Sequence, residues 1–184
     1  IDYVETLYKE LIKPGADFMA GFVDTHTGLP HASYDLWEEK FLTSTYTAAV
    51  TCQAMRTAAD IASALGYDSD KEHWLAVAEI LCNRAPAFFN EDRQMLNKGY
   101  LLSVEDGFVV DSVLDISSFY GAFKYDYASE EHLVATRSLI EKELLDISPS
   151  KGSARYENDN YFRSDPAHKG NPWFVTTLWM AQYY

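Results

Sequence analysis

Ser33-Tyr34-Asp35-Leu36-Trp37-Glu38-Glu39 is an acidic cluster built around a tryptophan, in a region otherwise rich in Gly, Pro and His. Burial against a ring and repulsion from a second charge both favour a protonated carboxyl group near neutral pH, which is what a general acid needs. The alternative is that Asp35, Glu38 and Glu39 are solvated acids before the next helix, where negative charge suits the N-terminal helix dipole. The stretch alone leaves both interpretations open.

Composition indicates a globular domain with an acidic surface. The 184 residues are 47% hydrophobic and 15% aromatic, which is enough for one domain with a sizeable core. The net charge of -13 argues against nucleic acid or an anionic membrane as partner, and a neutral sugar would fit it. We find no run of about 18 apolar residues that would span a bilayer, and no secretory leader.

The cysteines and histidines give no sign of a metal or cofactor. Cys52 and Cys82 each lie in an apolar helical pattern and are too few for a disulfide framework, so we expect both to be reduced core residues. Reduced thiols weakly favour a cytoplasmic location, and localisation is otherwise undetermined. The five histidines show no metal-ligand spacing with one another or with the cysteines, so we expect no metal and no cofactor.

Apolar periodicity predicts helices separated by two long loops. The clearest helix begins near Thr43 to Thr47 with hydroxyl caps and ends at Gly66, and the next begins with a capping box, Ser69 and Glu72. The other predicted helices are an opening one that ends near Pro14-Gly15 with a short continuation through Phe18 and Met19, one over Val113 to Phe123, one over Ser129 to Leu145, and one that Asn171-Pro172 caps.

Residues 99-110 break this helical pattern. Tyr100-Leu101-Leu102 and Phe108-Val109-Val110 flank Glu105-Asp106-Gly107, which is typical of a small β-hairpin. The long loops over 24–41 and 154–170 carry most of the polar chemistry, and loops of that length within compact domains are usually functional.

The second loop interleaves an arginine and aromatic rings with carboxylates and amides, over Ala154 to Arg163. Planar polar groups pair with the vicinal hydroxyls of a saccharide, while aromatic faces cover its apolar side. The alternative is a solvated Asn/Asp loop with an incidental salt bridge. Asp111 and Asp115, one helical turn apart, are interpreted as capping or solvated acids and are left out of the expected site.

Three motifs together resemble the glucoamylase family, glycoside hydrolase family 15, over essentially the whole chain from about Gly28 onward. They are Tyr34 to Glu39, then Arg155 to Tyr161, then Gly170-Asn171-Pro172-Trp173 leading into Leu178-Trp179. The resemblance implies an all-α fold, part of an (α/α)6 barrel, to which the small hairpin near 99-110 is added. It also implies exo-hydrolysis of α-1,4-glucosidic bonds with inversion at the non-reducing end of an α-glucan, releasing β-D-glucose.

The same resemblance implies roles for individual residues. Glu38 is expected to be the general acid, and Glu39 to bond a hydroxyl of the leaving sugar. Arg155 is expected to bind the non-reducing glucose, and Asp159 to hold that arginine. Leu36, Trp37 and Trp173 complete the expected substrate-binding set, with the two tryptophans as pocket walls.

An inverting reaction also needs a second carboxylate as base, which in the family follows the helix after Asn-Pro-Trp. This chain ends in that helix, and the family's Thr-Arg-Asp stretch is not found before the acidic cluster. Residues 1-184 are therefore expected to be a partial catalytic domain, about its middle half and truncated at both ends, with the base beyond Tyr184. Such a piece is expected to be inactive alone and, because apolar faces would be uncovered, to self-associate.

Two alternatives remain open. Enzymes that cleave α-1,6 dextran or trehalose share these motifs, so the linkage is not determined. A non-catalytic glucoamylase-like regulatory or binding domain is also possible, but such a domain can dispense with the acid, whereas Glu38 and its neighbours are intact. A helical scaffold without a sugar site would not require Arg155, Asp159 and Trp173 together.

Overall fold

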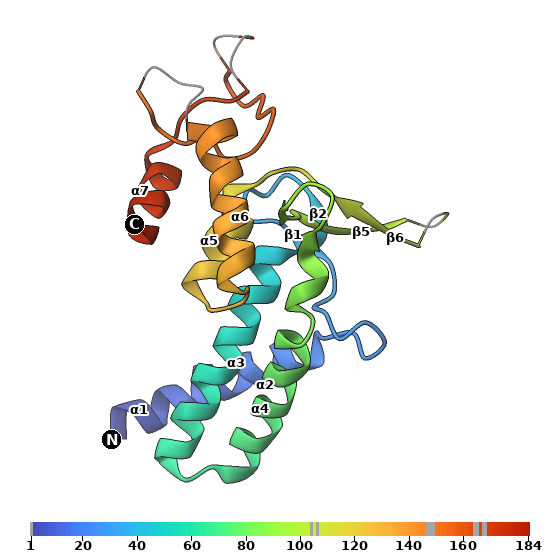
Figure 1. Ribbon diagram of the computed structural model, residues 1–184. Coiled ribbons are helices and arrows are strands. Elements are labelled where there is room, and N and C mark those ends of the chain that lie inside the picture. The colour runs from blue at the N-terminus through green and yellow to red at the C-terminus, as the bar shows by residue number, and fades with distance from the viewer. Residues whose placement is uncertain (1, 104, 106, 146–149, 164–165, 167–168) are drawn as a thin grey trace.

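The computed structural model describes all residues except 1, 104, 106, 146–149, 164–165 and 167–168. The chain is mostly helical. Figure 1 shows α3 (Thr45–Leu65) and α4 (Asp68–Cys82) as an antiparallel pair, with α5 (Ile116–Lys124) and α6 (Glu130–Ile140) beyond one end of it. The described irregular segments between α6 and α7 (Phe174–Tyr183) lie at the end of the molecule far from α1 (Asp2–Leu7).

The opening helix continues past Pro14, so its expected end near Pro14-Gly15 is wrong, while the expected continuation through Phe18 and Met19 is confirmed. α1 leads into a π-helical turn, η1 (Tyr8–Ile12), and then into α2 (Lys13–Gly21). The Lys13 N–H donates to the carbonyl of Tyr8, which is the wider i to i+5 pattern of a π-helix. Pro14 follows this turn as the second residue of α2.

Helix α3 begins and ends where its sequence predicts. The Ser44 hydroxyl accepts a hydrogen bond from the Thr47 N–H at 3.0 Å, and Gly66 closes the helix with a φ of 81°. The Tyr67 N–H then donates back to the Ala62 carbonyl, so that only two residues join α3 to α4. The expected capping box at Ser69 is therefore wrong, because α4 has already begun at Asp68.

Cys52 of α3 and Cys82 of α4 form a disulfide, so the expectation of two reduced thiols is wrong. The antiparallel packing of the helices brings the two Cα atoms to 6.2 Å although the residues are 30 positions apart. Periodicity assigns each cysteine to a buried face but does not show which residues of two faces meet. The preference for a reducing compartment consequently loses its basis.

A four-stranded antiparallel sheet in the order β1-β2-β5-β6 supports the acidic cluster. β5 (Gly99–Ser103) and β6 (Gly107–Asp111) confirm the predicted hairpin, although Val104 and Asp106 of its turn lie outside the described residues. The sequence does not indicate β1 (Ser33–Tyr34), which begins the cluster, or β2 (Phe41–Ser44), which follows it.

Gly99 allows the two halves of this sheet to meet. A Cβ atom at Gly99 would lie 2.3 Å from the carbonyl oxygen of Thr43, so a larger residue would force β5 away from β2. A separate two-stranded ribbon, β3 (Phe89–Asn90) with β4 (Met95–Leu96), follows α4 and the short 3-10 turn η2 (Ala85–Phe88).

The later helices agree with the predicted spans except at the start of α7. Asp115 caps α5, and Ser129 caps α6, which continues into a π-helical turn, η3 (Glu141–Leu145). Asn171-Pro172 does not cap the last helix, because Pro172 pairs with Ala154 as an isolated antiparallel bridge. This extended pairing holds the segment out of the helix until Phe174.

Of the predicted break at 148–152, Ser148 and Pro149 lie outside the described residues.

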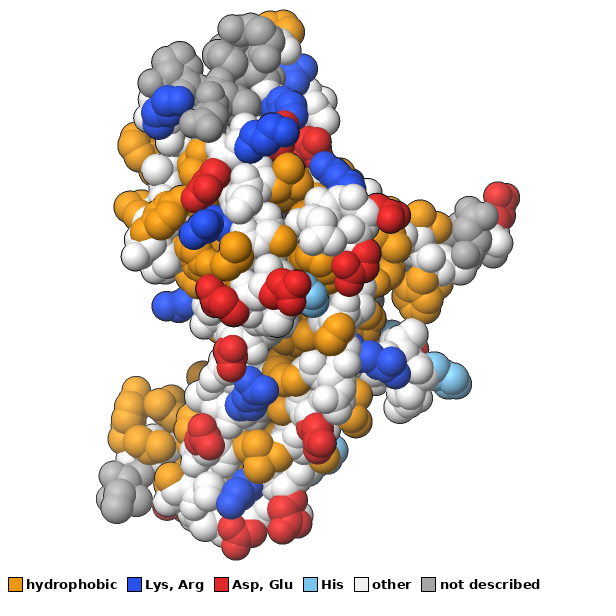
Figure 2. All heavy atoms as spheres, in the orientation of Figure 1, with side chains coloured by type: hydrophobic (Ala, Val, Ile, Leu, Met, Phe, Trp, Pro, Cys, Tyr) orange, Lys and Arg blue, Asp and Glu red, His pale blue; other side chains and the backbone are white. Residues whose placement is uncertain are grey.

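The core is apolar along the helix pair and charged near the acidic cluster. Met55, Trp74 and Leu81 are fully buried between α3, α4 and their neighbours. Figure 2 shows apolar side chains on the surface over the whole length of this face. Large apolar side chains are exposed on the β5–β6 ribbon and on α7, among them Leu102, Phe108 and Phe174. None of the helices in the described part of the chain combines the length and apolar character needed to cross a membrane.

Candidate active site

The acidic cluster forms the tight loop between β1 and β2. Asp35 organises this loop, because its N–H donates to the Lys40 carbonyl at 2.8 Å while its carbonyl accepts the Glu38 N–H at 2.9 Å. Its side-chain oxygen Oδ1 also accepts the N–H groups of Glu39 at 2.8 Å and Lys40 at 3.2 Å. Four backbone or side-chain bonds thus fix the path of residues 35–40.

Glu38 lies at the tip of this loop in a left-handed conformation, with a φ of 58°. Non-glycine residues adopt this conformation rarely, and such positions concentrate at functional sites. The Glu38 side chain is exposed, and its carboxylate has no hydrogen bond or ion pair with any residue that the structure describes. Within the described part of the chain, the loop therefore presents one unpaired carboxylate to solvent.

Arg155 is buried beside this loop and engages two carboxylates. Its Nε and Nη2 atoms donate to the two oxygens of Asp159 at 2.7 and 2.8 Å, and Nη2 also lies 2.8 Å from Oε1 of Glu39. Burial alone would lower the pKa of Arg155, but the hydrogen bonds and charges of Asp159 and Glu39 raise it above its ordinary value. The guanidinium is a fixed cation in a rigid bidentate pair.

Four aromatic rings surround the Arg155 guanidinium. Its central carbon lies 4.8 Å from the ring centroid of Trp173, 5.0 Å from Tyr161, 5.1 Å from Tyr156 and 5.3 Å from Trp37. The Tyr156 hydroxyl donates to the Glu39 carboxylate. Burial and this bond raise the pKa of Tyr156, so the hydroxyl stays protonated. Segments 118 residues apart in sequence, around Trp37 and Arg155, meet in this one cluster.

A second buried cluster lies beneath the loop. The Lys98 ammonium is 2.7 Å from Oδ2 of Asp35 and 3.0 Å from Oδ2 of Asp115. The Trp37 indole N–H donates to both oxygens of Asp115, at 3.0 and 3.1 Å. Burial alone would lower the pKa of Lys98, but the charges and hydrogen bonds of Asp115 and Asp35 raise it. Burial alone would raise the pKa of Asp35, but Lys98 and the N–H groups of Glu39 and Lys40 lower it, so that both groups stay charged.

A family model, Glycosyl hydrolases family 15, matches residues 3–184. The chain belongs to glycosyl hydrolase family 15. It is 30% identical to an uncharacterised glycosyl hydrolase of Methanocaldococcus jannaschii, over 82% of this chain and 23% of that relative. It is 28% identical to a glucoamylase of Saccharomycopsis fibuligera, over 97% of this chain and 36% of that relative. The chain thus spans only a quarter to about a third of the curated relatives that it matches.

Solved structures show the same fold for this part of the molecule. The glucoamylase of Saccharomycopsis fibuligera matches 97% of this family 15 chain and 38% of its own, with a TM-score of 0.72 and 22% identity. A bacterial glucoamylase in complex with acarbose matches 97% of this chain and 29% of its own, with a TM-score of 0.76 and 17% identity.

The structure brings most of the predicted family 15 site residues together. Arg155 contacts four of them directly, namely Trp37, Glu39, Asp159 and Trp173. Leu36 and Glu38 belong to the same loop as Trp37, and both side chains are exposed.

Other residues of these clusters were missed or set aside in the sequence. Tyr156 and Tyr161 belong to the quoted motif but are not among the expected site residues. Asp115, expected to be a capping or solvated acid, does cap α5, but it is fully buried and also bonds Trp37. Lys98 lies between β4 and β5, and no local pattern marks it. Its two carboxylate partners are distant in sequence, so only the fold reveals it.

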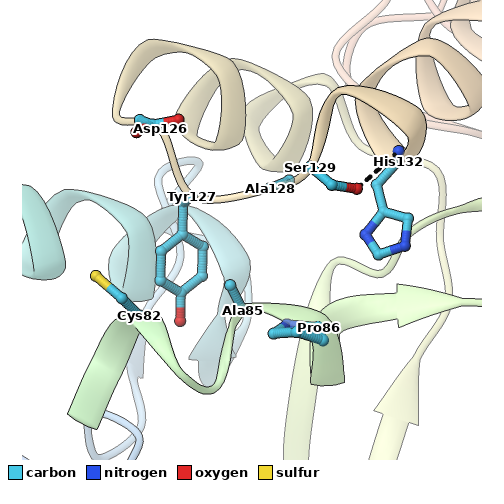
Figure 3. A pocket seen from close by; sticks show the side chains of 8 residues that line it. All are labelled: Cys82, Ala85, Pro86, Asp126, Tyr127, Ala128, Ser129 and His132. Carbon is cyan, nitrogen blue, oxygen red and sulfur yellow. Dashed lines mark hydrogen bonds between the residues drawn. The ribbon is translucent and has the colours of Figure 1, made fainter. Parts of the chain in front are cut away.

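A cavity elsewhere in the molecule has different chemistry. Figure 3 shows the cavity, of about 210 Å³, between the end of α4 and the start of α6. The Ser129 hydroxyl there accepts the His132 N–H, the Tyr127 hydroxyl donates to the Leu81 carbonyl, and the His132 ring stacks on Phe89. Each of these groups has a structural partner. In the described ranges no group of three or more His, Cys, Asp or Glu side chains is arranged to hold a metal ion.

Proposed function

We propose that this chain is part of an inverting glycoside hydrolase that removes glucose from the non-reducing end of α-1,4-linked glucans and releases β-D-glucose. We further propose that its helices form part of an (α/α)6 barrel, with residues 1–184 as a partial catalytic domain. Family 15 membership and the likeness to glucoamylase structures support both proposals.

The arrangement around Arg155 carries the functional proposal. A buried guanidinium fixed by Asp159 and Glu39 and enclosed by four aromatic rings combines planar polar groups with apolar ring faces. These are the two features that recognise a neutral sugar, through its hydroxyls and through its C–H face. A glucan is therefore the proposed substrate class, and acarbose, bound in one of the similar structures, is a carbohydrate-like ligand of this kind.

Glu38 is the proposed general acid. Glu38 lies between Trp37 and Glu39, which both contact Arg155, and its exposed carboxylate is available to protonate the leaving oxygen of a bound sugar. The neighbouring carboxylates are already engaged, Asp35 with Lys98, Glu39 and Asp159 with Arg155. From the resemblance to the glucoamylase family we propose that the second carboxylate, which activates water and lies about 6.5 to 9.5 Å from the acid, is beyond Tyr184.

A Glu38→Gln substitution in the full-length protein tests this role. It should lower kcat on maltotetraose by about 10² to 10⁴, the usual contribution of a general acid, while the Kd for the sugar changes less than about threefold. The matched control is Glu131→Gln in the first turn of α6, which removes an equally exposed carboxylate outside the cluster. Near-normal turnover by Glu38→Gln would remove Glu38 from the role, and an inactive wild-type protein that binds glucan would favour a non-catalytic binding domain.

We also propose that the isolated 184-residue chain self-associates through its uncovered apolar surfaces. A groove of about 410 Å³ between α2 and α3 is lined almost wholly by apolar atoms, including Leu11, Met19 and Ile61. Light scattering on the isolated chain should therefore show species larger than a monomer. A monodisperse monomer would contradict this proposal.

A further inference from the structure

We propose that Lys98 is a positioning residue for Glu38, holding the loop of the proposed general acid in its working geometry from beneath. This inference rests on the proposed function. Lys98 itself is placed away from the substrate, because its side chain is 2% exposed and its ammonium is enclosed by Asp35, Asp115 and the Tyr156 ring. It acts through Asp35 on one side and through Asp115 and Trp37 on the other.

Asp35 transmits the position of Lys98 to the loop. Its Oδ2 atom pairs with the ammonium at 2.7 Å, while Oδ1 accepts the N–H groups of Glu39 and Lys40. The Asp35 carbonyl accepts the Glu38 N–H. A rotation of the Asp35 carboxylate would therefore disturb the turn on both sides of Glu38.

Asp115 connects Lys98 to Trp37, one of the four rings around Arg155. Its Oδ1 atom accepts the N–H and hydroxyl of Ser117 at the start of α5, and both its oxygens accept the Trp37 indole N–H. One ammonium thus connects the start of β5, the start of α5 and the loop over 35–40. The Lys98 nitrogen also lies 4.6 Å from the ring centroid of Tyr156, which contacts Arg155.

The charges show why a neutral residue cannot substitute for Lys98. Asp35 and Asp115 are both almost fully buried and approach the same ammonium. Without it, two like charges would face each other in a site that excludes water, and they would separate or take up a proton. Either change alters the bonds that Asp35 and Asp115 make to the loop and to Trp37.

A comparison of two substrates tests Lys98→Met in the full-length protein. Maltotetraose needs a proton on its leaving oxygen, whereas α-D-glucosyl fluoride releases fluoride with little help from an acid. Because a displacement of about 1 Å can cost about 10² in rate, we expect kcat on maltotetraose to fall at least about tenfold. The rate on the fluoride should stay within about threefold, because its departure does not depend on where Glu38 holds its proton.

The matched control is Lys9→Met, which removes an exposed lysine that pairs with Glu5 and should leave both rates unchanged. Equal losses on both substrates, or no loss on either, would overturn the role of Lys98. If Lys98→Met does not fold, Asp115→Asn keeps the cap on α5 while weakening the ion pair, and it should show the same selective loss in smaller degree. Again, an unselective result would contradict the proposal.

Glu38→Gln, measured on the same two substrates, separates this inference from the proposed function. A selective loss in Glu38→Gln without one in Lys98→Met would refute the positioning role alone. No selective loss in Glu38→Gln would refute Glu38 as the acid, and the role of Lys98 would be refuted with it.

Discussion

The α3–α4 pair and the charged clusters at the acidic loop both contain fully buried side chains, but the interactions of these side chains differ. Met55 and Trp74 are fully buried among apolar neighbours, while Asp115 and Asp159 are fully buried among ions. Apolar burial stabilises a fold by about 25 cal/mol per Å², whereas a buried ion pair contributes little net stability because desolvation offsets its attraction. The helix pair is therefore expected to supply stability, and the clusters to supply geometry.

The largest expected effect on stability belongs to the helix pair. Trp74→Ala should lower the free energy of unfolding by about 3–5 kcal/mol, because it leaves a large cavity and removes the indole bond to Asp17. We expect kcat, measured well below the unfolding temperature, to be unchanged. Urea denaturation and steady-state kinetics measure the two quantities. Leu75→Ala, at an exposed position of α4, is the control. A fall in kcat of Trp74→Ala would contradict the claim that the helix pair supplies stability alone.

Arg155→Lys should produce the opposite pattern. The ammonium keeps the charge beside Asp159 but loses the bidentate geometry, so KM for maltotetraose should rise at least about tenfold while stability falls by only about 1 kcal/mol. Arg56→Lys on α3 is the control for the loss of a guanidinium. An unchanged KM would show that Arg155 has a structural role alone.

The pH dependence of stability tests the loop itself. Burial alone would raise the pKa of Asp35, but Lys98 and the N–H groups of Glu39 and Lys40 lower it below its usual range. A carboxyl with a lowered folded pKa contributes stability that is complete above its unfolded value, about 3.9, and lost as the pH falls through the folded value. Acidification below about pH 4 should therefore destabilise the wild type more steeply than Asp35→Asn. Parallel curves would contradict the ion pair.

The smallest expected effect concerns a helix cap. Ser44→Ala should lower the free energy of unfolding by about 1 kcal/mol, because it removes the acceptor for the Thr47 N–H. Ser69→Ala should change it by no more than about 0.5 kcal/mol, since Ser69 is an exposed residue inside α4 and caps nothing. Thermal unfolding of the two variants measures this difference. Equal losses of stability would mean that Ser69 does cap α4.

Local chemistry explains which parts of the fold the sequence predicts. The hydroxyl of Ser44 and the left-handed Gly66 end α3 through contacts within a few residues, and Gly107 turns the β5–β6 hairpin in the same way. Ser69 and Asn171 have the same local signals, but tertiary contacts override them. The return bond from Tyr67 starts α4 early, and the pairing of Pro172 with Ala154 delays α7.

The candidate site likewise contains residues that the sequence identifies and residues that only the fold identifies. Glu38, Glu39, Arg155 and Asp159 are in motifs that resemblance to a family identifies, and the structure shows contacts among the last three. Lys98 and the Cys52–Cys82 disulfide depend on which faces of distant elements meet. Periodicity shows that a residue is buried but not what lies opposite to it. The roles of Lys98 and of the two cysteines can therefore be identified only from the three-dimensional structure.

The anomeric form of the first product tests the central proposal most directly. The full-length protein is mixed with maltotetraose, and the anomeric protons are followed by NMR before mutarotation equilibrates them. An inverting exo-hydrolase with Glu38 as its acid should release β-D-glucose first, and the Glu38→Gln protein should release it far more slowly. Release of α-D-glucose, or no glucose from a folded protein that binds the sugar, would contradict the proposal.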